Sequence, residues 1–509
     1  MDRGSFISKV VMAALAVLAL AGCQLSEAPK PAQASHYSQL ANTPSPENYA
    51  TKEGAAKLSD ELLFERGVQS YLWALPAVNI RAMQEASEKT FGKGYNVLPI
   101  WKERLSAKTQ VTTPNSDVIY AMGYLDLKED GPIVIEAPPK LQGILDDFFQ
   151  RPICSEGKID GRPWCGDVGF VGPDKGEGGK YLLLPPDYKG AVPKGYFALR
   201  SRTYGVLVFW RGFFESPADL APPVDLMQRT KIYPLGKKDN AKPMQFPDAS
   251  GVPCDMLFAE DGSYFDMLAR FINDEYVDPA DMDMRGMLAG IGIVKGQPFQ
   301  PDSHAKEILD QAAKTAFKAA WIQETYRLEH RPGGLVYKDR HWINVFVGGS
   351  PEFQTSTFTD LDLRMGYFVT AYSTSPAMTV SIADKGAKYP STFRDADGDF
   401  LSGGSAYKLH LPPGIPAKLF WSVTVYNNRT GSGLDNGQPF PSLNAMDKPE
   451  TNADGSTDVY FGPNPPKDHE RNWLKTVPGK GYFMTLRLYG PTQAYFDQSY
   501  KIPDIEKVK

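Results

Sequence analysis

The clearest strand of the chain is DVIYAMGYLDL, residues Asp117–Leu127, and the expected fold class follows from it. It is short, rich in apolar and aromatic residues, and bounded by polar residues, which is typical of a β-strand. Four further runs of this kind follow, each bounded by Gly, Pro or Asp: GPIVIEAPP, KYLLLPPDY, GYFALRS and TYGVLVFWRGF. Short strands at this spacing predict a β-sandwich or jelly roll over residues 59–213, closing near Arg211.

The residues before and after these strands have the apolar spacing of helices. Residues 60–86 place apolar side chains at helical spacing after Ser59, a residue suited to an N-cap. Residues 214–355 are expected to be largely helical, with the strongest helix over Ser303–Leu328. The last part, 356–509, returns to strands and turns. We therefore expect a mixed, β-rich fold in which a helical connector joins two β-sandwich or jelly-roll-like domains.

The first residues predict export from the cell. A positively charged start precedes Val10–Ala21, an apolar segment that would rise roughly 18 Å as a helix, against about 30 Å for a bilayer core. This is typical of a signal peptide, residues 1–22. The sequence LAGC, ending at Cys23, resembles the bacterial lipobox, in which the Cys is acylated, for example with palmitate. The alternative is a plain signal peptide with an incidental Cys.

A flexible tether is expected over residues 23–58, because this segment is rich in Ala, Pro, Ser and Glu. Gln24 follows Cys23 where lipoproteins of the inner membrane often carry Asp. The lipobox resemblance therefore implies a lipid anchor in the outer membrane, with the body facing the periplasm and the membrane as its partner. The formal net charge is −5 and no long basic block is present, so no nucleic-acid partner is expected.

The cysteines predict one disulfide. The export compartment permits disulfides. Cys154 and Cys165 lie in a single loop, CSEGKIDGRPWC, where pairing needs only a short loop closure. Cys254 is then unpaired, and is expected to be a small buried apolar residue rather than a nucleophile.

Four motifs in the last third occur in an order that resembles a known family. They are FWSVTVYNNRT (420–430), NADGSTDVYFGPNPP (452–466), RNWLKTVPGKGYF (471–483) and LRLYGPTQAYFD (486–497). Together they resemble the C-terminal domain of unknown function 1214. Upstream, PNSDVIYAMGYLDL, PIVIEAPP and PPDYKGAVPKGYF resemble its usual companion, domain of unknown function 1254. One departure is that family members often read Asp-Thr-Leu-Tyr where this chain has Asp-Val-Ile-Tyr, residues 117–120.

The resemblance implies mostly fold. Both domains are expected to be β-sandwich or jelly-roll modules with helices between them. The C-terminal module is similar in core fold to peptide N-glycosidase F, which implies a carbohydrate-related role. Such folds carry binding modules as readily as enzymes.

Familiar catalytic and cofactor signatures are missing from the sequence. There is no G-x-S-x-G, H-E-x-x-H, Walker or Rossmann motif, and no Cys/His array with zinc spacing. No cofactor or metal is therefore expected. DADGD, residues 395–399, has the alternating carboxylates of a calcium loop, but Ala406 stands where that loop needs Glu, so a hairpin turn is the favoured interpretation.

A polar cluster opens the strand at Asp117. Asp117 and Tyr120 are the candidate catalytic residues, because a carboxylate beside a phenol can serve as an acid/base pair, and Asn115 is a candidate ligand contact. The alternative is structural: Asn115 and Asp117 close an Asx turn while Tyr120 fills the core.

In the C-terminal third, the candidate ligand-binding residues are Arg429, Asn472 and Trp473. Trp473 could stack on a sugar ring while Asn472 hydrogen-bonds it. The alternative, which we favour, is a buried Trp with a satisfied indole N–H, and Arg429 and Arg487 in structural ion pairs.

Three functions remain open from the sequence. The first is an envelope lipoprotein that binds or processes a carbohydrate. The second is a hydrolase or lyase acting on another small molecule at the domain junction, where a polar cleft lined by Asp117, Tyr120 and Arg429 would favour an enzyme. The third is a scaffold without a ligand.

Overall fold

The computed structural model describes residues 35–508. The chain divides into two compact units, Met1–Glu61 and Leu62–Lys509, with the boundary inside helix α2 (Lys52–Phe91). The expected signal peptide, residues 1–22, and the expected lipid attachment at Cys23 lie outside the described residues.

Parts of the segment expected as a tether are helical in the first unit. Helix α1 (His36–Ala41) starts after Ser35, whose hydroxyl accepts a hydrogen bond from the first turn. Helix α2 begins at Lys52, so the prediction of Ser59 as its N-cap is wrong. The Ser59 hydroxyl instead donates to the Ala55 carbonyl at 2.8 Å, one turn earlier in the same helix. Alanine favours the helix, and KEGAAKL extends it upstream.

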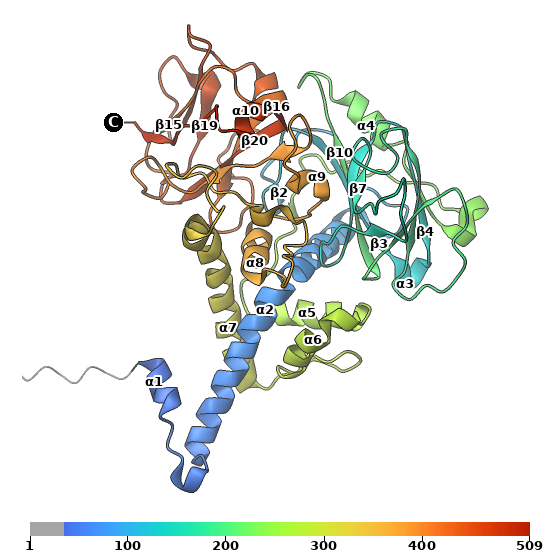
Figure 1. The fold of residues 1–509 in the computed structure, drawn as a ribbon, viewed down its shortest axis with the longest axis vertical. Helices are drawn as coiled ribbons and strands as arrows, with labels where there is room; N and C mark the ends of the chain where they lie inside the picture. Colours follow the sequence, from blue (N-terminus) through green and yellow to red (C-terminus); the bar gives the residue numbers. More distant parts are fainter. Residues whose placement is uncertain (1–34, 509) are drawn as a thin grey trace, which may run out of the picture. The chain divides into compact units, whose positions relative to one another are not determined.

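In the second unit, the N-terminal β-rich domain contains two five-stranded sheets (Figure 1, cyan to green). The first has the order β1-β3-β10-β5-β7 and comprises β1 (Ile100–Trp101), β3 (Ile119–Asp126), β10 (Gly205–Gly212), β5 (Gln142–Asp147) and β7 (Asp167–Val168). The second has the order β11-β4-β8-β9-β6 and comprises β11 (Lys231–Pro234), β4 (Ile133–Ala137), β8 (Gly179–Leu184), β9 (Phe197–Arg200) and β6 (Cys154–Ser155).

Two details modify the expected layout of this domain. Strand β11 pairs with β4, so the sheet continues beyond residue 213, where the sequence predicted that the domain ends. A further pair, β12 (Cys254–Asp255) with β2 (Thr109–Gln110), forms a separate two-stranded sheet. A short helix, α3 (Leu127–Asp130), follows β3.

Strands β3 and β10 are buried on both faces. Alternate residues of a strand point to opposite sides of the sheet. Ile119 and Ala121 of β3 therefore pack into the core between the two sheets, whereas Tyr120 packs into a larger cluster on the other side. This double burial explains why the sequence of the strand is apolar almost throughout.

The region between the two β-rich domains is rich in helices. It contains α5 (Ser263–Asp274), α6 (Met282–Ala289) and α7 (Ser303–Ile322), whereas α4 (Ala221–Met227) lies between β10 and β11 of the N-terminal domain. Helix α7 buries one stripe, which includes Leu309, Ala313 and Ala316, and a π-helical turn over Gln323–Arg327 follows it. Among residues 35–508, none of the helices combines the length and apolarity needed to span a bilayer.

The C-terminal β-rich domain follows α8 (Leu361–Thr370) and α9 (Pro376–Thr379) (Figure 1, orange to red). Its first sheet has the order β13-β20-β16-β17, with β14 also paired to β20, and comprises β13 (Ala387–Lys388), β20 (Tyr482–Pro491), β16 (Ala417–Asn427), β17 (Ser442–Asn444) and β14 (Ser391–Thr392). Its second has the order β19-β18-β15-β21 and comprises β19 (Trp473–Lys475), β18 (Thr457–Gly462), β15 (Tyr407–Leu411) and β21 (Glu506–Lys507). Helix α10 (Gln493–Phe496) lies between β20 and β21 in the sequence. The fold is therefore mixed with β-rich domains, as predicted.

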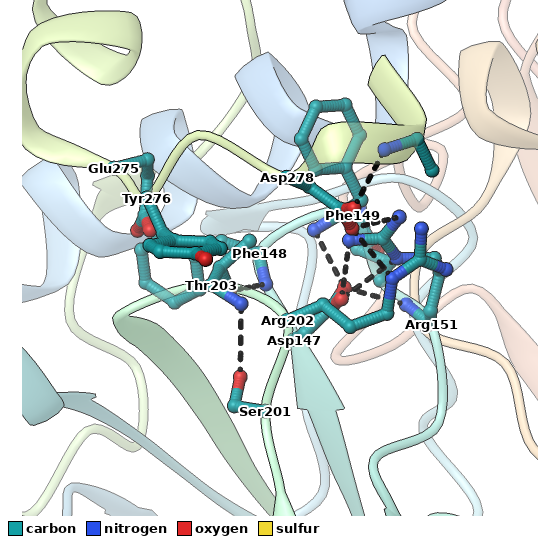
Figure 2. A network of polar contacts seen from close by, with 12 residues as sticks. Asp147, Phe148, Phe149, Arg151, Ser201, Arg202, Thr203, Glu275, Tyr276 and Asp278 are labelled. Carbon is teal, nitrogen blue, oxygen red and sulfur yellow. Dashed lines mark hydrogen bonds and ion pairs between the residues drawn. The ribbon is translucent and has the colours of Figure 1, made fainter. Parts of the chain in front are cut away.

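A network of charged side chains joins the N-terminal domain to the helices (Figure 2). Arg151, after β5, donates from Nε to Asp147 at 2.7 Å, and Arg202, before β10, donates from Nε to Asp278 at 2.7 Å. Glu275, after α5, accepts hydrogen bonds from the backbone N–H groups of Tyr204 and Gly205. In this network each of the two arginines is paired with a carboxylate.

The cysteines of the described chain take the expected states. Cys154 and Cys165 form a disulfide that closes the predicted loop, and Cys254 is free and buried. Burial raises the pKa of the Cys254 thiol, which disfavours the reactive thiolate.

Candidate functional site

A cavity of about 90 Å³ lies where the two β-rich domains and helix α8 meet. A single water needs only about 15 Å³ on such a scale, so there is room for several waters or a small organic molecule. Its charged lining residues are Arg211, Arg487 and Glu324. Its aromatic lining includes Tyr120, Tyr389 and Tyr489.

Strand alternation aims these residues at the cavity. The cavity-facing residues of β10 and β20 are Phe209, Arg211, Phe483, Thr485, Arg487 and Tyr489. The residues between them, such as Trp210 and Leu486, fill the cores of their own domains. The two-residue period therefore brings one arginine from each domain to the same space.

Arg211 has few partners. Its Nη2 lies 3.4 Å from the Met378 sulfur, a weak acceptor, and its Nε is buried without a hydrogen-bond partner within the described residues. The positive charge of Arg211 acts to lower the pKa of Asp167, against the larger effect of burial. The Asp167 carboxylate nevertheless accepts a hydrogen bond from Ala377 N at 3.0 Å and does not pair with the guanidinium. Arg211 thus brings a positive charge to the cavity that no carboxylate of residues 35–508 neutralises by direct contact.

Arg487 is buried and bonds only to neutral acceptors among the described residues. Its Nη1 donates to the Thr424 hydroxyl at 2.8 Å, and its Nη2 lies 3.4 Å from the carbonyl oxygens of Thr113 and Pro114. A guanidinium remains charged at any physiological pH. Both arginines therefore contribute positive potential to one small cavity.

Aromatic rings form much of the remaining wall. Tyr120 stacks on Phe209 with ring centroids 5.0 Å apart, and Phe420 stacks on Tyr489 at 4.2 Å. Asn115 donates from its side-chain amide to the Tyr489 hydroxyl. Burial raises the pKa of Tyr120 to about 12, so its phenol is neutral and available as a hydrogen-bond donor.

Glu324 is the acidic residue of the cavity wall. It lies in the π-helical turn after α7, and its carboxyl has no hydrogen bond or ion pair within the described chain. Burial alone raises its pKa to about 8. Titratable groups with strongly shifted pKa values in a concave site are typical of ligand-binding and catalytic centres.

Comparison with known families agrees with the two-domain layout. Residues 95–234 match the family described as "Protein of unknown function (DUF1254)", and residues 386–493 match "Protein of unknown function (DUF1214)". This chain carries the paired 1254 and 1214 domains. Their order is the one that the sequence motifs predicted.

One solved structure extends the likeness in fold over most of the chain. The VPA0106 protein from Vibrio parahaemolyticus is 18% identical, with a TM-score of 0.50, over 88% of this chain and 100% of its own. An uncharacterized protein from Burkholderia cenocepacia is 14% identical, with a TM-score of 0.36, over 90% of this chain and 96% of its own. At these identities the first comparison supports the fold alone. A search of the curated proteins finds no match.

Of the candidates in the 1254 domain, Asn115 and Tyr120 line the cavity but Asp117 does not. Asp117 is fully buried and its carboxylate is saturated. It accepts hydrogen bonds from Arg104 at 2.8 Å and from Ser442 and Asn444 of the 1214 domain, each at 2.7 Å. Asp117 thus forms hydrogen bonds between the two domains, and it does not share the cavity with Tyr120.

The candidates in the 1214 domain lie away from the cavity. Arg429 is exposed and bonds Glu260 at 2.7 Å. Asn472 is buried, and its amide donates to the carbonyls of Glu450 and Asp458. The Trp473 indole N–H donates to the Gly462 carbonyl at 2.9 Å. The indole N–H of Trp473 is thus satisfied and Arg429 is in an ion pair, but Trp473 is half-buried rather than buried and the Arg429 pair is exposed to solvent.

The Asp-rich segment is a turn. Asp395 accepts hydrogen bonds from the backbone N–H groups of Asp397 and Asp399, at 3.1 and 3.0 Å. Over the described part of the chain, no group of three His, Cys, Asp or Glu side chains is arranged to hold a metal ion.

Two of the three charged cavity residues, Arg211 and Glu324, were not predicted from the sequence, and the third, Arg487, was expected in an ion pair. A signal for both arginines was present: each is the single charge within an apolar strand, GVLVFWRG for Arg211 and FMTLRLYG for Arg487. A charge inside a doubly buried strand needs a partner or a function. No comparable signal marked Glu324, because it follows a helix that carries many exposed charges.

Proposed function

We propose that the cavity between the 1254 and 1214 domains binds a small organic anion. The observation that carries the proposal is Arg211, whose guanidinium faces the cavity with a thioether as its nearest hydrogen-bond acceptor. A desolvated charge without a counter-ion is costly. A carboxylate or phosphate of a ligand would supply that counter-ion and could accept paired hydrogen bonds from the guanidinium.

The rest of the wall favours a ligand with an apolar or aromatic body. The tyrosine and phenylalanine rings around the two arginines offer stacking faces, and the neutral Tyr120 hydroxyl offers a further donor. Mostly apolar walls with a few convergent polar groups are typical of small-molecule sites.

A carbohydrate ligand remains within this proposal in one form. A sugar acid or sugar phosphate would supply both the anionic group and a ring face for the tyrosines. Neutral sugars have less support, because Trp473 and Asn472, the expected platform, already bond to backbone carbonyls.

The proposal is tested by thermal shift of the full chain with matched anionic and neutral probes: benzoate with benzamide, hexanoate with hexanamide, and galacturonate with galactose. A probe at 100 times its Kd should stabilise the fold by about 2.7 kcal/mol. We expect at least one anion to shift the wild type, and its neutral counterpart to have no effect. Arg211→Met should abolish the shift.

The matched control is Arg202→Met. Arg202 is an arginine of the same domain that already bonds Asp278 (Figure 2), so its loss should leave the anion shift intact. Equal shifts with neutral and anionic probes, or an Arg211→Met variant that responds like the wild type, would contradict the proposal.

A second candidate is a hydrolase or lyase that acts on such an anion. The observation that favours it is the unpartnered Glu324 carboxyl in the same cavity, since an acid with a pKa near neutrality is suited to proton transfer. Incubation of the shifting anion and its esters with the full chain, followed by mass spectrometry, separates the two: product formation supports the enzyme, and an unchanged probe supports a binding protein.

We also propose that the chain is an exported lipoprotein anchored to the outer membrane through Cys23. The support is the short apolar segment Val10–Ala21 followed by LAGC. Cells fed an alkyne-tagged palmitate should label the wild type, and Cys23→Ser should abolish labelling. Labelling that survives Cys23→Ser would exclude this anchor.

A further inference from the structure

Glu324 is placed in the cavity by a local irregularity of its helix. Helix α7 ends at Ile322 and continues as a π-helical turn over Gln323–Arg327. Such turns cost regular hydrogen bonding and are frequent at functional sites. On the packed helix α8, Gly366 leaves room for the carboxyl: a Cβ at that position would lie 2.7 Å from Glu324 Oε1.

The carboxyl has no partner among the described residues. The neighbouring charges are already paired with others, Arg327 with Asp362 at 3.2 Å and Glu329 with Arg394 at 3.3 Å. The adjacent Gln323 is also unusual, since both polar atoms of its buried amide lack a hydrogen-bond partner. Unsatisfied buried groups are rare in native structures and call for a ligand or water.

Glu324 is also separate from the two arginines. Burial is the one cause of its raised pKa, and the hydrogen bonds of Arg211 and Arg487 go to other residues. At neutral pH the group is therefore mostly the neutral acid, which offers an O–H donor to the cavity. The titratable residues that share the cavity are the arginines and the tyrosines, among them Tyr367 on α8.

A comparison with Glu275 shows what the missing partners mean. Glu275 is similarly buried, but its carboxylate accepts hydrogen bonds from Tyr204 N at 2.6 Å and Gly205 N at 2.9 Å. Its role is therefore explained within the chain. Glu324 has no such partner among the described residues, and it lines the cavity.

We propose that Glu324 is the second ligand contact of the cavity, donating a hydrogen bond to a neutral oxygen of the bound anion. The ligand class is then an organic acid that carries a carbonyl, ether or hydroxyl oxygen at a distance from its anionic group. This inference rests on the proposed function, because the arginines must first hold the anionic group.

Isothermal titration of the full chain with paired acids tests the inference. The pairs are 4-acetylbenzoate with 4-isopropylbenzoate, and 5-oxohexanoate with hexanoate, which differ in the distal oxygen. We expect the wild type to bind the oxygen-bearing acid of at least one pair about tenfold more tightly, the value of one hydrogen bond.

Two variants assign that preference to Glu324. Glu324→Gln keeps an N–H donor and should retain most of the preference. Glu324→Leu has no donor and should bind both acids of a pair equally, while still binding them. Glu275→Gln is the control for a buried carboxyl elsewhere, and should bind as the wild type does.

The outcomes distinguish the role of Glu324 from the proposed anion site. Wild-type binding of both acids without preference, lost in Arg211→Met, would overturn the role of Glu324 and leave the anion site standing. A preference that persists in Glu324→Leu would overturn it as well. Failure of every acid to bind would contradict the anion site, and the inference with it.

Discussion

Arginines at two places in the second unit differ in their partners. In the network of Figure 2, Arg151 and Arg202 each bond a carboxylate, Asp147 and Asp278, at 2.7 Å. In the cavity, Arg211 and Arg487 meet neutral acceptors and aromatic rings. Both pairs lie at junctions between β-rich and helical parts of the second unit, so location alone does not account for the difference.

The difference gives a criterion for deciding whether a buried charged side chain serves the fold or binds a ligand. A buried ion pair is satisfied within the chain, and removing one partner leaves the other uncompensated. A buried charge without a counter-ion costs stability in the free protein and is retained when something outside the chain supplies the counter-ion. The same logic distinguishes Glu275 from Glu324. Four variants, taken from the largest expected effect to the smallest, test this comparison.

Arg151→Met should lower the free energy of unfolding by about 3–5 kcal/mol, because it leaves the Asp147 carboxylate buried without its cation. Urea unfolding followed by far-UV circular dichroism measures the change. A loss below about 1 kcal/mol would mean that the network is no more than a set of weak surface pairs.

Glu324→Gln should change how stability depends on pH. The Glu324 pKa is 4.5 in the unfolded reference and about 8 in the fold, so folding takes up a proton between these values. The stability from the protonated form is complete below pH 4.5 and is lost as the pH rises through 8. From about pH 5 to about pH 8 the wild type should lose about 3 kcal/mol relative to Glu324→Gln.

Urea unfolding at a series of pH values measures this difference. Other groups, Glu275 and Asp167 among them, are common to both proteins and cancel in the comparison. Parallel pH profiles for the two proteins would show that the Glu324 carboxyl is solvated or paired in solution.

Arg211→Met should leave the unliganded protein as stable as the wild type or raise its stability by about 1–2 kcal/mol, because an unpaired charge is replaced by an apolar chain. The sign is opposite to that expected for Arg151→Met. Thermal unfolding without ligand measures it, and a loss of more than about 2 kcal/mol would show that Arg211 is a structural residue.

Arg429→Ala should change the unfolding free energy by less than about 0.5 kcal/mol, because its pair with Glu260 is exposed to solvent. It should also leave the anion shift unchanged, since Arg429 lies outside the cavity lining. Altered anion binding in this variant would return Arg429 to the site that the sequence assigned to it.

Much of the fold could be predicted from local patterns. The short apolar runs of DVIYAMGYLDL and its companions gave strands, and the apolar stripe of Ser303–Leu328 gave a helix that the structure contains as α7. The boundaries were less accurate, as at Ser59 and residue 213. Helix propensity extends α2 upstream, and β11 belongs to the sheet only because it pairs with β4, a contact that no local pattern reveals.

The candidate site was predicted only in part. Asn115 and Tyr120 came from a motif and line the cavity, whereas Asp117, in the same motif, points to a different set of partners. Asp117 precedes β3, and the residues that contact it come from distant parts of the chain. For Asp117 the decisive contacts are Ser442 and Asn444, more than 300 positions away.

The sequence by itself determined the alternation of the strands, the helical connector, the short loop between Cys154 and Cys165, and the order of the two domains. These depend on local propensity and two-residue or helical periods, which neighbouring residues set. Only the tertiary structure decided which charges are paired, because an ion pair such as Arg104 with Asp447 forms across domains. It alone shows that Arg211, Arg487 and Glu324, from three separate elements, border one cavity without carboxylate or cation partners in the described chain.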